Sequence, residues 1–455
     1  MGKQISTLHA TYRKALPLCI RTALGITRNR MKSLAWKVQN LMPRDKLAKL
    51  QRKVSSQGAH RARLARQRAL LRKKAAINVV FEVTGISKWK ADSLLRLMIQ
   101  HPRFNPIVWH VPYNDPPDPE RDKMEMQQCR DYFLPLGVKL VDYATLGDFP
   151  TPERPDVIFP NEPYNYLIHR RYHDGLMRHL ICFAPYGFAS IDSKEIRNQI
   201  IPNGALHYFV ENETSRIQTG QLMDNRGVNI VASGHPMADS FLYPAGARPT
   251  VWKGCGPGMK KVIWAPHWTV APDSCTFLFY GTFLCTGEVM LEMAEKYRDK
   301  IQFAFKPHPN LYYTLCKHPQ WGKEKTDAFY AKWREMPNTQ YENGAYTDLF
   351  MQSDAMIHDC GSFIQEYLFA DKPCMYLKDP ENHQEYGAMA TDCLNAYQMG
   401  VTREEIEAFL QMVLRGEDPK AEVRRELRRK YLIPPNGKSA AQNIIDCLLM
   451  QEHHG

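Results

Sequence analysis

Short apolar runs alternate with amphipathic segments along most of this chain. The first run, INVVFEV at Ile77–Val83, is predominantly apolar and is bounded by polar residues. A strand that is buried on both faces of a parallel sheet has this near-continuous pattern. The segment after it has apolar residues at helical spacing, with Ser87 as the expected N-cap. The pattern therefore predicts parallel strands connected by helices.

This alternation occurs twice. The first series of predicted strands comprises 77–83, 104–111, 138–143, 155–160, 179–188, 207–213 and 228–236. A stretch rich in Gly and Pro, Tyr243–Lys261, then interrupts the pattern. The second series comprises the strand-like segments 261–268, 301–309, 355–362 and 373–377, with helices predicted at Gly287–Tyr297 and Phe363–Ala370. From Thr402 onward the chain is predicted to be helical.

Two Rossmann-like, doubly wound parallel-sheet domains joined by a Gly/Pro linker describe the GT-B type of α/β fold, in which the ligand occupies the cleft that the domains face. The predicted boundaries are a basic helical arm (1–76), an N-terminal acceptor domain (77–245), a linker (246–262) and a C-terminal nucleotide-donor domain with a helical tail (263–455).

The positive charge of the chain is concentrated in the arm. The net charge is +12, yet residues 1–75 hold 20 Lys/Arg and a single acid, Asp45, and the remainder holds 40 Lys/Arg and 47 Asp/Glu. A long basic helix is predicted from Asp45 to Lys74. We expect it to bind an anionic membrane surface, where each basic residue contributes about 1 kcal/mol. The alternatives are a solvated extension, or a helix that packs on the body through Leu47, Leu50 and Leu64.

Other partners and compartments are disfavoured by composition. Nucleic acid is not expected, because Trp36 is the only aromatic residue between Tyr12 and Phe81 and so offers few stacking platforms. The eleven cysteines form no CxxC pair, which is typical of reduced thiols in the cytoplasm. No signal peptide or membrane-spanning run is recognised. Metal-binding motifs and a P-loop are also missing, so no cofactor is expected.

Two predicted strands end in residues suited to a phosphorylated ligand. Lys306 and His308 follow one strand, and Asp359 and Ser362 follow another. Ligands of open α/β sheets bind outside the carboxyl ends of the strands. The sequence therefore predicts a phosphate-binding site at this edge.

Four ordered motifs carry a resemblance to a known family. They are WAPHWT (264–269), FKPHPN (305–310), SDAMIHDCGSF (353–363) and ADKPCMYL (370–377). In this order they resemble the CDP-glycerol glycerophosphotransferase family, whose members build teichoic acids and related capsular polymers. The resemblance covers about residues 150–450 and is concentrated between 260 and 380.

The resemblance implies a transferase that moves a polyol phosphate from a CDP-activated donor to a glycan or lipid-linked acceptor. The acceptor hydroxyl would attack the β-phosphorus and release CMP. Such an enzyme would work in the cytoplasm, peripherally on the inner face of a bacterial membrane. Two alternatives stay open: a GT-B glycosyltransferase that uses a nucleotide sugar, and a non-catalytic assembly partner in capsule synthesis.

The resemblance also assigns roles to residues of the donor domain. His308 would bind or protonate the pyrophosphate, with Lys306 in support. Asp359 would orient His308, bind ribose or accept a proton. The expected contacts of the donor are Gly361 and Ser362 at a helix N-terminus, Glu366 toward a ribose hydroxyl, and His267 and Thr269 at a third strand end. Ser362 could instead only cap its helix.

This sequence departs from the family at two places. HWT at 267–269 differs from the family's usual Thr and Arg near the phosphates. Family members also have a His-Gly pair in the N-terminal half, where this chain has Tyr186-Gly187. Since the ordinary pKa of tyrosine is about 10, Tyr186 would be a poor base at neutral pH. Glu162, which follows the preceding predicted strand, is the substitute candidate for the general base.

Overall fold

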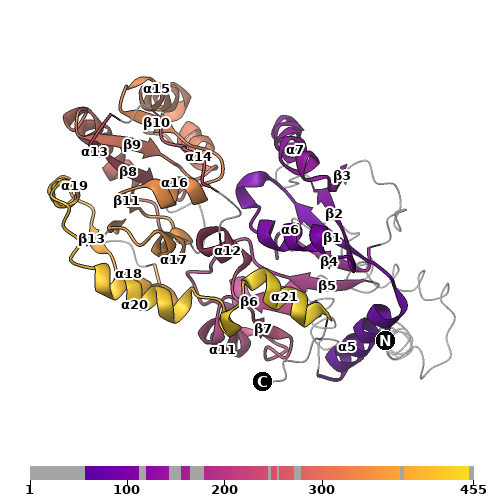
Figure 1. Cartoon of the computed structure of the whole chain (residues 1–455). Coiled ribbons are helices and arrows are strands. Elements are labelled where there is room, and N and C mark those ends of the chain that lie inside the picture. Colours follow the sequence, from indigo (N-terminus) through magenta and orange to yellow (C-terminus); the bar gives the residue numbers. More distant parts are fainter. Residues whose placement is uncertain are drawn as a thin grey trace, which may run out of the picture. The chain divides into compact units, whose positions relative to one another are not determined.

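The computed structural model describes residues 57–111, 119–142, 155–163, 179–243, 247–253, 256–270, 278–379 and 384–449. These residues form two compact units (Figure 1). The N-terminal unit contains the described residues up to Tyr186, Ser193–Pro236 and those from Pro435 onward. The C-terminal unit contains Gly187–Asp192 and Met237–Pro434.

The N-terminal unit is built on a seven-stranded sheet with the order β3-β2-β1-β4-β5-β6-β7. All its strand pairs are parallel. The strands are β1 (Ile77–Val83), β2 (Phe104–His110), β3 (Lys139–Asp142), β4 (Val157–Phe159), β5 (Leu180–Phe183), β6 (His207–Val210) and β7 (Ile230–Ala232). The order reverses between β1 and β4, which is the switch point of a doubly wound sheet.

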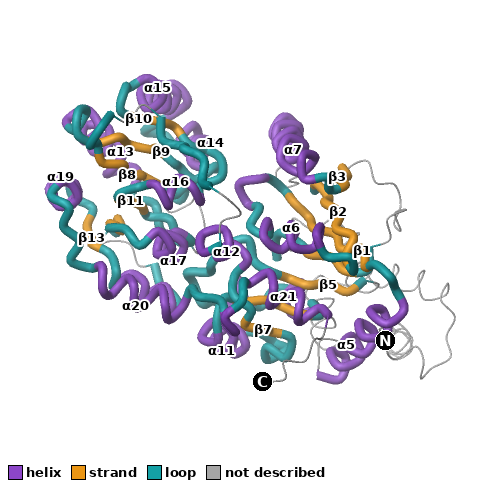
Figure 2. Tube along the Cα trace, in the orientation of Figure 1, coloured by secondary structure: helices purple, strands orange, loops and turns teal. Residues whose placement is uncertain are grey.

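Helices cover both faces of this sheet (Figure 2). They are α5 (Gln57–Lys73), α6 (Asp92–Gln100), α7 (Pro119–Phe133), α9 (Lys194–Arg197), α10 (Ile200–Gly204), α11 (Glu213–Leu222) and α21 (Ala440–Leu449), with 3₁₀ turns at Ile86–Lys88, Leu134–Leu136 and Pro435–Gly437. Alternate residues of β1 belong to different cores: Phe81 packs with residues of α6, α7 and α21, and Val80 packs with α10. Burial on both faces explains the apolar run in the sequence.

Helix α5 packs against this unit through its apolar side chains. Leu64, Leu70 and Leu71 contact the hydrophobic core that contains β1. Gln67 Nε2 donates to the carbonyl of Leu448 at 2.8 Å, which links α5 to α21. The described part of the predicted arm is therefore a helix that packs on the N-terminal unit. This agrees, at Leu64, with the predicted alternative of a helix that packs on the body. Leu47 and Leu50 lie outside the described residues.

Removal of α5 is expected to destabilise the protein. A chain that begins at Ala75 should have a free energy of unfolding about 2–4 kcal/mol lower than one that begins at Gln57, because three leucines lose their packing. Urea denaturation of the two proteins measures the difference. Arg61→Gln, which changes an exposed residue of the same helix, is the control. Equal unfolding midpoints for the two chains would contradict a structural role for α5.

The C-terminal unit contains a six-stranded parallel sheet with the order β10-β9-β8-β11-β12-β13. The strands are β8 (Lys260–Ala265), β9 (Ile301–Phe305), β10 (Thr339–Tyr341), β11 (Ala355–His358), β12 (Cys374–Leu377) and β13 (Gln398–Gly400). The order of this sheet reverses between β8 and β11. Each unit thus repeats the same doubly wound topology.

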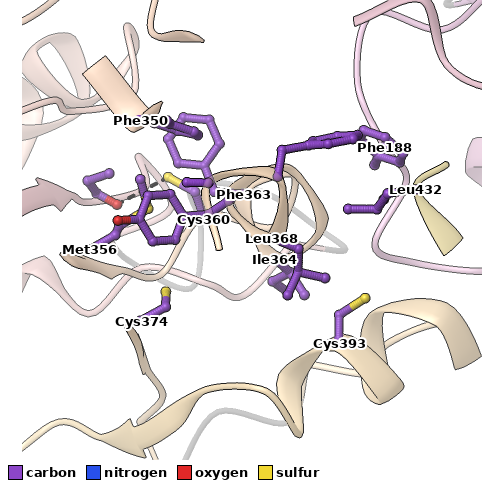
Figure 3. Packing of buried hydrophobic residues seen from close by; sticks show 14 of the residues in the cluster. Phe188, Phe350, Met356, Cys360, Phe363, Ile364, Leu368, Cys374, Cys393 and Leu432 are labelled. Carbon is purple, nitrogen blue, oxygen red and sulfur yellow. Dashed lines mark hydrogen bonds between the residues drawn. The ribbon is translucent and has the colours of Figure 1, made fainter. Parts of the chain in front are cut away.

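The faces of the second sheet are also buried under helices. These are α12 (Pro236–Leu242), α13 (Phe283–Lys296), α14 (Leu311–Lys317), α15 (Gly322–Glu335), α16 (Thr347–Gln352), α17 (Phe363–Glu366), α18 (Ala388–Leu394), α19 (Arg403–Leu414) and α20 (Ala421–Tyr431), with a 3₁₀ turn at Tyr367–Ala370. Trp264 of β8 packs with α13, α15 and α19, and Ile263 belongs to the opposite core. Figure 3 shows that second core, in which Phe188 packs with α17 and its neighbours.

The structure confirms the predicted parallel strands and differs from the sequence-based prediction in three details. Strands β10 and β13 were not predicted. Helix α6 begins at Asp92 with Ala91 in the N-cap position, so Ser87 is not its cap. The helical tail is divided: α19 and α20 belong to the C-terminal unit, and α21 packs in the N-terminal core. The expected assignment of the whole tail to the C-terminal domain is therefore corrected.

The described residues form neither a disulfide nor a membrane-spanning helix. Their eight cysteines are free thiols. None of their helices combines the length and the apolar character needed to cross a bilayer.

Candidate active site

Loops at the carboxyl edge of the C-terminal sheet hold most of the predicted site residues. His267 follows β8, His308 follows β9, and Asp359 follows β11. Because β8 lies between β9 and β11, the three loops are neighbours. They lie at the switch point of the sheet, which is the usual ligand position in doubly wound folds.

Two histidine rings lie side by side at this edge. The ring centroids of His267 and His308 are 5.0 Å apart with an interplanar angle of 60°. The ring of Trp268 contacts both histidines, with centroid distances of 6.0 Å to His308 and 5.8 Å to His267. The sequence predicted both histidines as site residues, and the structure places them in contact.

The protonation state of His267 follows from its hydrogen bonds. Its Nδ1 accepts from the backbone N–H of Thr269 at 3.3 Å and lies 2.9 Å from the Thr269 hydroxyl. A backbone N–H only donates, so Nδ1 carries a lone pair and the proton is on Nε2. Burial lowers the pKa of His267 to about 3. The imidazole is therefore neutral at physiological pH.

Backbone and side-chain hydrogen bonds hold His308 in its loop. Its N–H donates to the carbonyl of Pro266 at 2.9 Å, and its own carbonyl accepts from Leu311 N–H at 2.9 Å. Its Nδ1 accepts from the N–H of Asn310 at 3.1 Å, so the neutral ring carries its proton on Nε2. The two prolines of the KPHP segment stiffen this loop. Both histidines thus share the same tautomer.

Asp359 connects the loop after β8 to the start of α13. Its carboxylate accepts from His267 N–H at 2.5 Å, Thr282 N–H at 2.6 Å and the Thr282 hydroxyl at 2.9 Å. Burial raises the pKa of Asp359 to about 6, and these donors act to lower it. The side chain is fully buried. This arrangement suits a residue that positions His267 better than one that touches substrate.

Lys306 and Glu366 are linked through Tyr346. Lys306 Nζ donates to the carbonyl of Gly344 at 3.0 Å and lies 5.1 Å from the centroid of the Tyr346 ring. The hydroxyl of Tyr346 donates to Glu366 Oε2 at 2.5 Å. Glu366 is almost completely buried. To contact a ribose hydroxyl, as the sequence predicted, Glu366 would thus have to break its buried hydrogen bond with Tyr346.

Gly361 and Ser362 lie where the chain enters α17. A Cβ at Gly361 would lie 2.6 Å from Ser190 Oγ and 2.7 Å from Tyr280 Cζ, so a larger residue cannot fit without a shift. Ser190 and Tyr280 share a hydrogen bond of 2.6 Å between their hydroxyls. Ser362 makes no side-chain capping bond to α17, which has only four residues. The alternative that Ser362 only caps its helix is therefore wrong.

The remaining predicted residues are divided between the units. Gly187 belongs to the C-terminal unit, where its Cβ position would lie 3.6 Å from Glu366 Oε1. Tyr186 and Glu162 belong to the N-terminal unit. Glu162 forms an ion pair with Lys88 and accepts from the Thr84 hydroxyl at 3.3 Å. The Lys88 ammonium also lies 5.7 Å from the centroid of the Tyr186 ring.

Several contacts of the site were not predicted from sequence. They involve Lys88, Ser190, Tyr280, Thr282 and Tyr346. Thr282 had a partial signal, because a threonine directly before an amphipathic helix is a common N-cap residue; it does occupy the N-cap position of α13, but its hydroxyl donates to Asp359 and makes no capping bond. The others had none, since their partners are far away in the chain. Within the described part of the chain, no group of three or more His, Cys, Asp or Glu side chains could hold a metal ion.

Comparison with known proteins identifies the fold. No family model matches the chain, and no curated protein does. Among solved structures, a variant of the wall teichoic acid polymerase TagF matches with a TM-score of 0.56 and 13% identity over 85% of this chain and 92% of that chain. A UDP-GlcNAc 2-epimerase from Neisseria meningitidis bound to UDP-GlcNAc matches with a TM-score of 0.55 and 12% identity, over 82% and 100%.

A third structure, S. aureus MnaA with UDP, has a TM-score of 0.51 and 10% identity over 81% of this chain and 95% of that chain. At such low identity the likeness concerns the fold alone. Together with the two parallel sheets, it establishes that this chain has the GT-B fold.

Proposed function

We propose that this chain is a transferase that moves a polyol phosphate, such as glycerol phosphate, from a CDP-activated donor to a glycan or lipid-linked acceptor. The reaction would release CMP and extend a teichoic acid or capsular polymer. The four motifs that resemble CDP-glycerol glycerophosphotransferases support this substrate class. Three of them end at the carboxyl edge of β8, β9 and β11.

The observation that carries the proposal is the histidine pair at the switch point. Two imidazoles 5.0 Å apart, each with its Nε2 protonated in the neutral form, suit the oxygens of a diphosphate. Phosphoryl transfer depends chiefly on positioning and on stabilising charge at these oxygens. We propose His308 and His267 as donors to the diphosphate, with Lys306 adding positive charge at the same edge.

The proposed step forms one bond and breaks one. The acceptor oxygen bonds to the β-phosphorus, and the bond between that phosphorus and the bridging oxygen breaks. The electron pair of the broken bond stays on the phosphate of CMP, where His308 Nε2–H donates. The proton of the acceptor hydroxyl passes to a base, for which we propose Glu162. Its ion pair with Lys88 would have to open or shift for this role.

Two other functions are alternatives to this proposal. A GT-B glycosyltransferase with a nucleotide-sugar donor is favoured by the fold shared with a structure bound to UDP-GlcNAc. It is also favoured by the departure from the family at Tyr186 and at HWT. A non-catalytic assembly partner would bind no nucleotide at all.

We also propose that the basic arm holds the enzyme on an anionic membrane surface. Arg61, Arg68 and Arg72 of α5 are exposed, and their spacing places them on one face of the helix. The leucines of the same helix are used in packing, so this contact would be electrostatic. It should weaken as salt increases.

Ligand-dependent melting of the full-length protein tests the proposed donor. CMP, CDP, CDP-glycerol and CDP-ribitol are expected to raise the melting temperature, because a ligand at 100 times its Kd stabilises by about 2.7 kcal/mol. UDP and UDP-GlcNAc are expected to have little effect. His308→Ala should lose the response, and His318→Ala, at the far end of α14, should keep it.

The other outcomes of this experiment separate the alternatives. Stabilisation by UDP or UDP-GlcNAc but not by cytidine nucleotides would replace the proposal with the glycosyltransferase function. No response to any nucleotide would favour the assembly partner.

A further inference from the structure

The hydroxyl of Thr269 lies between two backbone donors and the ring of His267. Its Oγ1 accepts from the N–H groups of Tyr280 and Gly281, both at 3.2 Å. With its lone pairs occupied, the hydroxyl has only its proton left to offer. It therefore donates that proton to Nδ1 of His267 at 2.9 Å.

The two backbone donors are held close to Thr269 by tight packing. A Cβ at Gly281 would lie 2.5 Å from the carbonyl oxygen of Thr269. Only glycine allows the segment before α13 to come this near to the loop after β8. Asp359 ties the same two segments through His267 N–H and Thr282 N–H. The position of the Thr269 hydroxyl is thus fixed from both sides.

The consequence for His267 is a fixed tautomer. Nδ1 receives two donors, the Thr269 hydroxyl and the Thr269 N–H, and this leaves the ring proton on Nε2. Hydrogen bonds in such a series polarise one another, which makes Nε2–H a better donor. Among the described residues, Nε2 has no hydrogen-bond partner.

We propose that Thr269 is a positioning residue that fixes His267 as a neutral Nε2–H donor toward a phosphate oxygen of the activated donor. The identity of that donor rests on the proposed function; the tautomer does not. A neutral imidazole at His267 avoids the cost of burying a cation when no ligand is bound. It still stabilises the negative charge that collects on the diphosphate oxygens during transfer.

Two substitutions of His267 separate this role from simple packing. In His267→Gln the side-chain amide reaches the position of Nε2, and in His267→Asn it reaches only the position of Nδ1. We expect the Gln variant to bind CDP-glycerol within a few-fold of the wild type. The Asn variant should bind about 10- to 100-fold more weakly, as for a lost hydrogen bond to a charged group. Calorimetric titration of the full-length proteins measures both constants.

The tautomer is measured directly by nitrogen NMR on protein labelled at histidine. The signals of His267 are assigned by their loss in His267→Gln. We expect the Nε2–H form, without titration between about pH 6 and pH 8. Thr269→Ser should preserve it. Thr269→Val keeps only the backbone N–H donor at Nδ1, so the Nε2–H form should persist while Nε2–H becomes a weaker donor and CDP-glycerol binds more weakly. Thr326→Val is the matched control, because Thr326 is a buried threonine bonded to the carbonyl of Gly322 within α15.

The possible results separate this inference from the proposed function. If UDP-GlcNAc binds in place of CDP-glycerol, and the Gln and Asn variants still differ, the proposed donor is wrong and the role of His267 stands. Equal binding by the Gln and Asn variants would overturn the inference. So would an Nδ1–H or charged His267 at pH 7, or the absence of binding by CDP-glycerol, UDP-GlcNAc and inorganic pyrophosphate alike.

Discussion

The His308→Ala variant is expected to release CMP from CDP-glycerol about 10²- to 10⁴-fold more slowly than the wild type, in proportion to the usual contribution of an acid–base side chain. Its fold should persist, because the backbone of His308 makes the bonds that hold the loop, to Pro266 and Leu311. The side chain accepts a hydrogen bond at Nδ1 from Asn310 N–H. CMP release with a defined acceptor, together with a thermal melt, measures both effects.

His318→Ala is the control for this experiment. His318 also accepts a backbone N–H at Nδ1, from Gln320, but lies beyond α14. Near-normal CMP release by His308→Ala would remove this histidine from the chemistry. A wild-type protein that binds CDP-glycerol and releases no CMP with any acceptor would instead support the assembly partner.

The Asp359→Asn variant is expected to lose roughly 1–3 kcal/mol of stability and most of its activity. The carboxylate accepts three hydrogen bonds on its two oxygens. Asparagine has one carbonyl oxygen, so its amide would face either His267 N–H or the donors of Thr282. One buried donor is then left unsatisfied, and the loop that carries His267 shifts. Chemical denaturation and CMP release measure the two losses.

Asp354→Asn provides a matched control at the other end of the same strand. Asp354 accepts a single backbone bond, from Lys261 N–H at 2.8 Å, and its side chain is 35% exposed. The Asp354 substitution should lower the free energy of unfolding by less than the Asp359 substitution does, and it should leave activity unchanged. Equal stability losses for the two variants would show that the buried carboxylate has no special role.

The same carboxyl predicts a pH dependence. Its folded pKa of about 6 lies above the ordinary value of 3.8, so the folded protein binds this proton more tightly than the unfolded chain. Ionisation of Asp359 therefore lowers the free energy of unfolding as the pH rises from 3.8 to about 6. Activity should change in the opposite direction and fall below pH 6, since protonation removes an acceptor of His267 N–H or Thr282. Asp359→Asn should lack both changes.

The central strands were predictable because of their burial. Strands β1 and β9 are covered on both faces, and their sequences are correspondingly apolar. Strands β10 and β13 contain three residues each, TQY and QMG, at the edges of the sheet. An edge strand needs little apolar surface, so no periodic signal marks it. Its pairing with the neighbouring strand decides that it is a strand.

The sequence by itself determined which residues follow each strand, because apolar runs that end in polar residues locate the carboxyl edge. It thereby identified His267, His308 and Asp359 as candidates. Only the tertiary structure decided that these side chains meet, since that depends on the strand order β9-β8-β11. The tertiary structure also decided that Glu162 pairs with Lys88. The apolar face of α21 predicts a helix, but only the tertiary structure shows which core buries that face. Periodicity is local, whereas a partner distant in the chain is chosen by packing.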